Sequence, residues 1–494
     1  MPLLPATDSQ QVQQALIDRR GKKGAKYVVM EKLINVSLTL ILALAISLLG
    51  IGEALATELK VALYPYVPRL EQFQTAIQAE WDLVEPNVPL NFVPSEDWDG
   101  GYSKNPPEDA DVYVFDAMFF DYFRSKNWLE PIQASEIDNL DDFVEYAIDG
   151  VKVDGEYYAI PQLGCANIIF YHKEDAAIAN ATNLDEINNA LSSCTYTSEI
   201  PPNIRGMMLD MAGGTTNATL YLDIAHSLTG QYPFPLPWTE SELNSQAIDN
   251  MQDLLGMASY ENATDSMKPK QQPYQQAEWF SNGWGRAFMG YTEAMSHMSE
   301  NTRQNIGFKV MPLSDQDQSY PEVFYADVIG VNTTTEQRGT RDLAVKLANT
   351  MAASTTMIAS IGPDGTSDYP QYLMATRPSV FQTLEKSFPL YGDMFRLIQG
   401  QNIIMFKVND QSRSWLNTMK NSIRENARED YSCGCDYPAI EPILNNSYAP
   451  EICGNTCADH GSSWNGQWTN AYPAAQETSV CGCNACPLPS KSGT

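Results

Sequence analysis

The sequence predicts an α/β protein with two lobes, followed by a separate cysteine-rich tail. Short alternating apolar segments and amphipathic segments of helical period follow one another from Leu59 onward, which is typical of α/β folds. Residues 163–171 and 323–332 are two further extended segments, which we expect to link the lobes. After about Asn426 the composition shifts to Cys, Asn, Ser, Gly and Pro, with little apolar periodicity.

The first lobe is predicted to open with a strand over 59–63, where apolar residues alternate with polar ones before Pro65 and Pro68. Residues 69–84 follow as a helix whose apolar face carries Phe73, Ile77 and Trp81. Strands over 90–93 and 112–115 flank a turn-rich acidic loop, and Asp116 follows the second strand. We expect a mostly parallel sheet, in which ligands bind beyond the carboxyl ends of the strands.

The predicted organisation assigns 57–163 and about 325–426 to the first lobe and to C-terminal helices shared between the lobes. Residues 164–324 form the second lobe, and a later helix is expected over 341–354. Residues 427–494 form the tail. A chain of 494 residues is long enough for two such lobes with a buried core.

Residues 1–56 resemble an export signal. A basic, polar lead precedes an uncharged run over 33–51, and Ala54-Leu55-Ala56 has the small-x-small pattern of a signal peptidase site. Met30 is an alternative start, and a retained membrane anchor is the competing interpretation of the long apolar run. We expect a secreted or periplasmic protein that has no stable membrane association once the signal is cleaved.

The charge is strongly acidic, with a formal net charge of -30. Phosphate binding needs a basic surface, so this composition argues against nucleic acid as a partner. An acidic protein of this kind is soluble and weakly attracts small cations. We expect a monomer whose partners are small molecules, and the sequence indicates no cofactor.

Most of the nine cysteines lie in the tail. Their spacing, together with His460, could hold zinc, but outside the cell disulfides are the stronger expectation. If Cys165 stays free, an even number remains for pairing, including Cys194, and the sequence does not choose among the connectivities. We therefore predict disulfides and no metal site.

Cys165 stands apart from the other cysteines, near the start of an apolar run. An exported protein usually pairs its thiols, because a free thiolate oxidises. An unpaired cysteine in the body of such a protein is either buried and inert or kept as a nucleophile.

Glu293 lies in a second informative segment, residues 284–295. Residues 287–291 are predicted as a buried strand and Thr292 as a helix N-cap, which puts Glu293 in the first helical turn at the mouth of the cleft. A carboxylate in a partly apolar pocket has a raised pKa and can act as a base. The alternative is an acid that only complements the helix dipole. His297, four residues later, could tune Glu293, but a packing or solvent role is the simpler expectation.

Several segments in fixed order resemble thiaminase I, the thiamine pyridinylase family. The resemblance covers about 59–416 and rests on Tyr64-Pro65-Tyr66-Val67-Pro68, Tyr102 with Pro106-Pro107 and Asp111-Val112-Tyr113-Val114-Phe115-Asp116, Pro161-Gln162-Leu163-Gly164-Cys165 with Phe170-Tyr171, Met211-Ala212-Gly213-Gly214-Thr215-Thr216, Gly290-Tyr291-Thr292-Glu293 and Phe324-Tyr325-Ala326-Asp327-Val328. It implies a bilobal, periplasmic-binding-protein-like fold of type II with an interlobe cleft. The tail has no counterpart in that pattern, and we interpret Gly213-Gly214-Thr215-Thr216 as structural rather than as an anion cradle.

The resemblance also implies the chemistry. Cys165 would attack the pyrimidine ring of thiamine, Glu293 would take the thiol proton, and an external amine or thiol would replace the thiazole in a ping-pong reaction. Substrate-binding residues implied by the resemblance or placed by the pattern are Tyr64, Tyr66, Tyr102, Asp116, Tyr291, Tyr325 and Asp327, with Asp99 a weaker candidate. A binding protein that captures thiamine or another cationic solute without catalysis is the main alternative. A cysteine protease would need a histidine partner, and no histidine lies in a recognisable context.

Overall fold

The computed structural model describes residues 58–191, 206–211, 213–257, 274–283, 285–316, 320–399, 402–428, 436–459, 461–469 and 479–483. The chain divides into units of residues 1–57 and 58–494, and all described residues belong to the second. The predicted signal over 1–56 lies outside the described residues, as does His460. No helix among the described residues is long and apolar enough to cross a membrane.

The first lobe is built on a seven-stranded sheet in the order β12-β6-β11-β3-β1-β2, with β13 paired to β11. Its strands are β1 (Leu59–Ala62), β2 (Leu90–Phe92), β3 (Val112–Asp116), β6 (Ile160–Cys165), β11 (Glu322–Val331), β12 (Met374–Ala375) and β13 (Ile403–Met405). The sheet is mixed rather than mostly parallel: β1 runs parallel to β2 and β3, as predicted, whereas β11 runs antiparallel to both β3 and β6. The physical reason is that β6 leads out of this sheet toward the second lobe and β11 returns from it.

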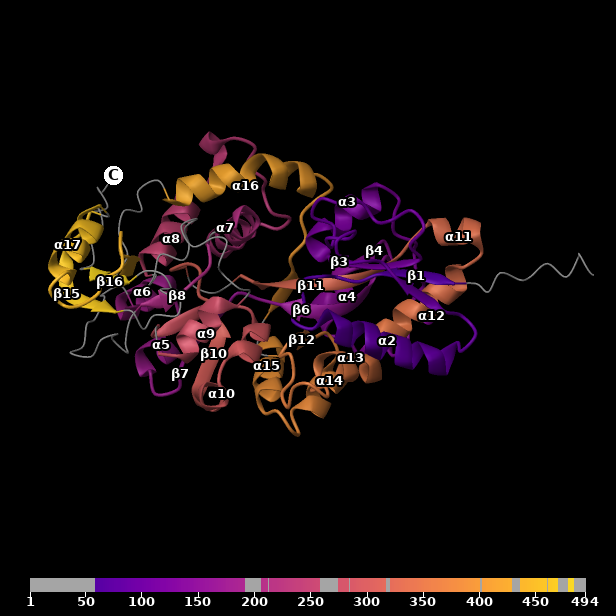
Figure 1. Ribbon diagram of the computed structural model, residues 1–494. Helices are drawn as coiled ribbons and strands as arrows, with labels where there is room; N and C mark the ends of the chain where they lie inside the picture. The colour runs from indigo at the N-terminus through magenta and orange to yellow at the C-terminus, as the bar shows by residue number, and fades with distance from the viewer. Residues whose placement is uncertain are drawn as a thin grey trace, which may run out of the picture. The chain divides into compact units, whose positions relative to one another are not determined.

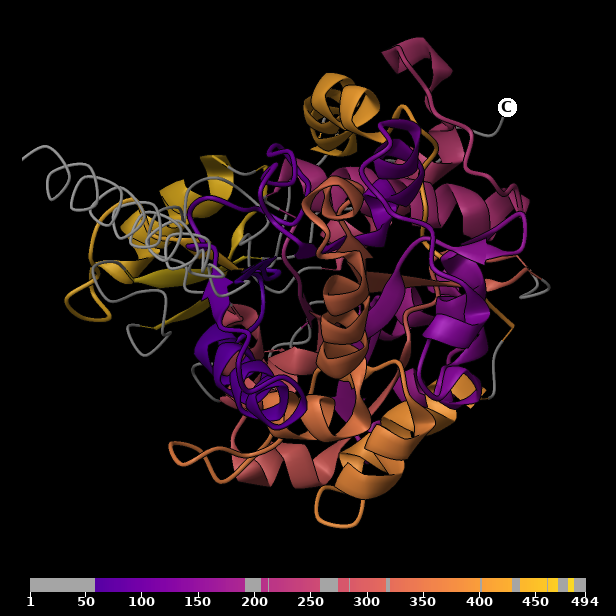
Figure 2. The same ribbon diagram turned by 90° about the vertical axis from the view of Figure 1, so that its right-hand side faces the viewer.

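Helices cover this sheet. They are α2 (Leu70–Val84), α3 (Phe120–Ser125), α4 (Glu145–Gly150), α11 (Thr334–Arg338), α12 (Arg341–Ala352), α13 (Ser354–Ile361), α14 (Pro378–Leu384) and α15 (Leu390–Gln399), with 3-10 turns η1 (Ala117–Phe119), η2 (Ala134–Glu136) and η3 (Leu140–Asp142) and the hairpin β4 (Lys152–Val153)–β5 (Glu156–Tyr157). Helix α12 packs on β3, β6 and β11 and against α2 and α13. In Figure 2 the orange helices of this region lie toward the viewer, beside the indigo helix α2. The predicted helix over 69–84 is confirmed as α2, with Phe73, Ile77 and Trp81 buried.

The second lobe has a four-stranded sheet in the order β10-β7-β9-β8. Its elements are β7 (Ile168–His172), β8 (Met207–Met208), β9 (Ala287–Gly290), β10 (Ile306–Val310), α5 (Ala176–Asn180), α6 (Leu184–Leu191), α7 (Gly214–Thr229), α8 (Ser245–Gly256), α9 (Gln275–Ser281), α10 (Glu300–Asn305), η4 (Glu240–Glu242) and η7 (Thr292–His297). Only Ala166 and Asn167 separate β6 in the first sheet from β7 in the second. The site described below depends on this short crossing.

Helix α16 (Ser412–Arg428) follows β13 and lies along α7 and α8 of the second lobe (Figure 1). The backbones of α7 and α16 approach closely at Gly214, where a Cβ would lie 3.3 Å from the carbonyl oxygen of Lys420. This close contact supports a structural role for the Gly213-Gly214 pair, because a larger residue would push α16 away.

The tail forms a small antiparallel sheet in the order β14-β16-β15 beside one helix. Its elements are β14 (Asp436–Pro438), α17 (Ala449–Asp459), β15 (Trp464–Thr469) and β16 (Val480–Cys483). The disulfides Cys453–Cys481 and Cys457–Cys483 join α17 to β16, which confirms the prediction of disulfides for these cysteines. Cys194, Cys433, Cys435 and Cys486 lie outside the described residues. The weak periodicity of the tail hid its regular structure, because cross-links take over much of the role of a hydrophobic core in so small a unit.

Candidate active site

Asp116 and Asp327 are register partners on the antiparallel strands β3 and β11. Directly paired residues of antiparallel strands project to the same face with neighbouring side chains. Tyr102 Oη donates to Asp116 Oδ2 at 2.5 Å, and the Met118 amide donates to Oδ1 at 2.9 Å. Burial raises the pKa of Asp116 despite these bonds. Burial, then the charges of Asp116 and Glu293, raises the pKa of Asp327 well above its usual range. The pair is therefore suited to retaining a proton.

Cys165 is the last residue of β6 and pairs with Tyr325 on β11. Its thiol is free and half-buried, so it escapes the pairing that the tail cysteines undergo. Burial, and then the charges of Glu293, Asp327 and Asp116, raises the pKa of the thiol well above its usual range. The thiol therefore needs a base that removes its proton as it attacks.

Glu293 is the second residue of η7, and Tyr291 alone separates η7 from β9. The expectation that Thr292 is the N-cap is wrong by one residue: Tyr291 has the extended backbone of the N-cap, and Thr292 is buried inside the turn. Burial raises the pKa of Glu293 to about 7, although Tyr274 Oη donates to Glu293 Oε1 at 3.3 Å and opposes this rise. A carboxylate with a pKa near neutrality is well matched to proton transfer at physiological pH.

The predicted tyrosines form two groups around these acids. Tyr64, Tyr66 and Tyr102 contact one another edge to face, with ring centroids 5.4 Å apart for Tyr64–Tyr66 and 6.0 Å for Tyr66–Tyr102. Tyr291 and Tyr325 form the second group, with centroids 6.5 Å apart. Tyr66 is 57% exposed, so it lies at the rim. Burial, then the charges of Tyr102, Asp327 and Asp116, raises the pKa of Tyr64 well above its usual range.

Asp99, the weaker candidate, does not join the acids. Its carboxylate accepts hydrogen bonds from Ser103 and from the amides of Gly101 and Lys104 within its own loop. Burial alone would raise the pKa of Asp99, but these hydrogen bonds lower it. Asp99 therefore stabilises the loop that carries Tyr102.

Several neighbours of the site were not anticipated from the sequence. Tyr274 bonds Glu293 and stacks on His297, with ring centroids 4.7 Å apart. Asn167 Nδ2 lies 2.8 Å from Asp223 Oδ2 and 3.2 Å from Tyr325 Oη. The only available signal was that Asn167 lies two residues beyond Cys165, since the other contacts form between segments far apart in the chain.

Gly164 allows a further residue to approach the nucleophile. The buried hydroxyl of Tyr146 has no hydrogen-bond partner among the described residues, and a Cβ at Gly164 would overlap it. Burial, then the charges of Cys165 and Asp327, raises the pKa of Tyr146, whose hydroxyl lies against the residue that precedes Cys165. A glycine before the cysteine is thus required by packing.

Comparison with known proteins agrees with this geometry. Residues 166–314 match the Thiaminase-1 domain family. Thiaminase-1 of Paenibacillus thiaminolyticus is 35% identical over 368 residues, covering 74% of this chain and 87% of the relative.

Solved structures extend the likeness to the fold. Clostridium botulinum thiaminase I in complex with thiamin is 36% identical with a TM-score of 0.69, covering 75% of this chain and 100% of that one. Thiaminase I from Bacillus thiaminolyticus is 35% identical with a TM-score of 0.68, covering 75% and 99%. Maltose-bound MalE3 of T. maritima, at 15% identity and a TM-score of 0.55, covers 76% and 99% and shares the fold alone.

The tail has a different relationship, since residues 446–483 match the Mannan-binding protein family. The body and the tail of the chain therefore resemble different families. The chain belongs to the thiaminase I family of thiamine pyridinylases, on a solute-binding-protein-like α/β fold.

Proposed function

We propose that this chain splits thiamine and transfers its pyrimidinyl-methyl group to an external amine or thiol through a covalent adduct on Cys165. The observation that carries the proposal is the placement of the free thiol under the influence of Glu293, whose pKa is about 7. The Clostridium botulinum relative was solved with thiamin bound, which supports thiamine as the substrate.

In the first half-reaction the sulfur of Cys165 bonds to the pyrimidine carbon beside a ring nitrogen, and the thiol proton passes to Glu293. The bond between the methylene and the thiazolium nitrogen then breaks, and the thiazole leaves with the electron pair. Thiolate formation and attack are concerted, because the acids around Cys165 disfavour a free thiolate.

Asp116 and Asp327 assist by hydrogen-bonding the exocyclic amine and holding a proton near a ring nitrogen. That proton withdraws electrons from the ring while the sulfur adds. The tyrosines stack on the pyrimidine and offer the negative faces of their rings to the thiazolium cation. In the second half-reaction the acceptor bonds to the methylene, the sulfur–ring bond breaks, and Cys165 recovers its proton.

The test is release of thiazole from thiamine by the purified chain with aniline as acceptor, followed by chromatography. Wild type should turn over, whereas Cys165→Ser should release no thiazole and should still bind thiamine in calorimetry. Intact mass of wild type incubated with thiamine alone should show a pyrimidinyl-methyl adduct. Binding of thiamine by wild type without release of thiazole would instead identify a solute-binding protein.

A second function is supported by the tail, which we propose binds mannose-containing polysaccharide. The observation that supports this second function is the match of residues 446–483 to the Mannan-binding protein family. Trp464 and Trp468 lie on one strand, β15, and are both partly buried, and Trp468 Nε1 donates to Asn446 Oδ1 at 2.9 Å. Aromatic faces beside amide groups suit the apolar faces and hydroxyls of a sugar.

Retention of the full chain on immobilised mannan tests this function. Trp468→Ala should elute earlier than wild type, and Cys165→Ser should be retained like wild type, since the thiol belongs to the other module. Equal elution of Trp468→Ala and wild type would remove the argument for a sugar site on β15.

A further inference from the structure

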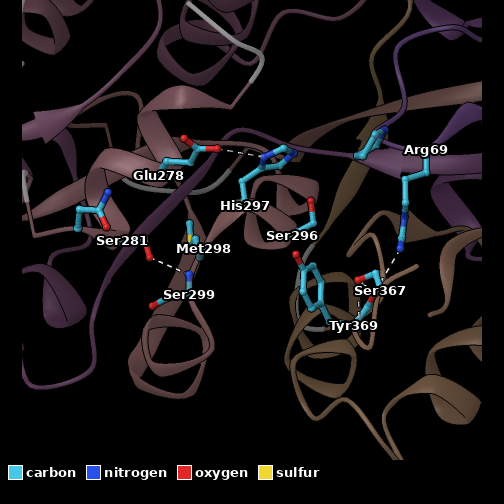
Figure 3. Close-up of a pocket in the computed structure, with 11 residues that line it drawn as sticks. Arg69, Glu278, Ser281, Ser296, His297, Met298, Ser299, Ser367 and Tyr369 are labelled. Carbon is cyan, nitrogen blue, oxygen red and sulfur yellow. Dashed lines mark hydrogen bonds and ion pairs between the residues drawn. The ribbon is translucent and has the colours of Figure 1, made fainter. Parts of the chain in front are cut away.

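The two lobes leave a cavity of about 530 Å3 between them, and His297 at the end of η7 lies in its wall. Figure 3 shows Ser299 of the second lobe on one side of this cavity and Arg69 and Tyr369 of the first lobe on the other. Side chains of the two lobes do not pack together across the cavity itself. Contacts at its edge therefore matter for holding the lobes at a fixed separation.

Arg303, in α10 of the second lobe, makes such a contact with the first lobe. Its guanidinium carbon lies 4.2 Å from the centre of the Tyr369 ring and 5.9 Å from the centre of the Tyr372 ring. A guanidinium within about 6 Å of an aromatic face is attracted by the negative face of the ring. Tyr372 is buried and Tyr369 is 37% exposed, so a substitution at Tyr369 leaves the hydrophobic core intact.

The same guanidinium also holds the turn that carries Glu293. Arg303 Nη1 donates to the carbonyl oxygens of Met298 and Met295, the second at 3.4 Å. Met295 lies in η7, two residues after Glu293, and Met298 is the C-cap of that turn. Carbonyl groups at the end of a helical turn need partners from outside it. Arg303 therefore fixes the end of η7 while it contacts the other lobe.

Tyr369 is in turn fixed to the aromatic segment of the first lobe. Arg69 Nη2 donates to the carbonyl oxygen of Tyr369 at 3.2 Å, and Arg69 Nη1 lies 3.4 Å from Asp364 Oδ2 in the same loop. Arg69 is the N-cap of α2 and closely follows Tyr64 and Tyr66 in the chain. A continuous set of contacts thus joins the segment that carries these tyrosines to η7 of the second lobe.

We propose that Arg303 and Tyr369 are positioning residues, which clasp the two lobes together and hold η7 at the distance from Cys165 that proton transfer requires. The inference rests on the proposed function, in which Glu293 takes the thiol proton. Both residues act indirectly: Arg303 acts through the backbone of η7, and Tyr369 acts through Arg303. An arginine that only capped η7 would need no aromatic ring from the other lobe.

The aromatic face of Tyr369 can be tested in the full chain. Tyr369→Leu removes the face and should lower kcat/KM for thiazole release about fivefold, the size of a partly shielded cation–π contact. Tyr369→Phe keeps the face and should rescue the rate to within about twofold of wild type. Tyr158→Leu is the matched control and should keep the wild-type rate, because Arg124 lies 5.9 Å from the centre of the Tyr158 ring within the first lobe alone.

The pH profile distinguishes positioning from a general loss of stability. Burial raises the pKa of Glu293 to about 7, so lobes that separate more widely should hydrate it and move the rising limb of kcat/KM toward its ordinary value of 4.5. Tyr369→Leu and Arg303→Gln should both show this shift, and Tyr369→Phe should not.

Three results would overturn the clasp. They are a wild-type rate in Tyr369→Leu, an equal loss in Tyr369→Phe or Tyr158→Leu, and a loss of rate with no shift of the limb. Absence of thiazole release by wild type would instead overturn the proposed function.

Discussion

Asp116 and Asp327 face each other across two antiparallel strands, and burial raises the pKa of both carboxyl groups. A protein that needed only a stable core would not place two acids there, because burying like charges costs free energy. A ligand with an exocyclic amine and a cationic ring recovers that cost through hydrogen bonds and charge. We therefore interpret the paired acids as a binding site whose burial lowers the stability of the ligand-free protein.

Thiazole release should depend on pH through Glu293. Because this base must be unprotonated in the free enzyme, kcat/KM for thiamine should rise with pH through an apparent pKa of about 7. Glu293→Gln should reduce the rate about 100-fold or more and remove this limb of the profile. A wild-type profile that stays flat between pH 5 and 8 would contradict the role of Glu293.

Asp327→Asn should stabilise the protein at high pH while abolishing activity. Because the pKa of Asp327 is raised above its ordinary 3.8, the native state binds more protons than the unfolded state, and wild-type stability falls as pH rises above that value. Each pKa unit of that rise corresponds to about 1.4 kcal/mol of native-state stability that wild type loses at high pH, and the neutral amide loses none of it. Urea unfolding at pH 5 and pH 8 should show an advantage for the variant that grows with pH.

Asp99→Asn is the matched control for that measurement. Its pKa is lowered overall by hydrogen bonds, so the carboxylate stabilises the native state above the ordinary pKa. The amide should therefore destabilise the protein at pH 8. If both variants shift stability in the same direction, the argument from buried charge is wrong.

Gly164→Ala should destabilise the fold by about 1–3 kcal/mol, the usual cost of overpacking. The added methyl overlaps the Tyr146 hydroxyl, which makes no hydrogen bond within the described part of the chain. Tyr146→Phe alone should therefore be nearly neutral, and the double variant should recover most of the loss in a double-mutant cycle. Additive effects of the two changes would show that the hydroxyl is not the obstacle.

Removing both described disulfides by Cys457→Ser with Cys453→Ser should unfold the tail and leave thiazole release intact. These bonds join α17 to β16 around the small core of the tail, and losing a disulfide from a small domain costs about 2–5 kcal/mol. Protease sensitivity confined to the tail, with unchanged turnover, is the expected result. Loss of turnover would show that the catalytic lobes depend on the tail.

We also predict export of the chain, which the tail disulfides support because such bonds persist in oxidising compartments. N-terminal sequencing of the protein recovered from the medium or periplasm should give a start after Ala56. A start at Met1 or Met30 would indicate that the leader is retained.

Local sequence patterns anticipated the elements that depend on local physics. Alternation and helical period placed β1, α2 and β3 close to their observed bounds. The isolation of Cys165 from the tail cysteines singled out the free thiol. The direction of β11 was predicted wrongly because this strand returns from a distant segment, and no local pattern records the direction of a returning strand.

Contacts made by side chains from separate segments were equally hidden. Tyr274 contacts Glu293 because the fold brings α9 beside η7. No pattern within either segment predicts that contact. The pairing of the tail cysteines was undetermined because the spacing permits many connectivities. The bounds of a single helix or strand were predictable from its own residues, whereas the contacts between helices and strands were not.

Two residues separate the sheet that ends in Cys165 from the sheet that supports Glu293. The Cys165 sulfur and the Glu293 carboxylate are therefore carried by different sheets. Any increase in the separation of the two lobes moves the proton acceptor away from the thiol. The packing of one lobe on the other therefore sets the distance over which the proton moves. Neither segment fixes that distance alone.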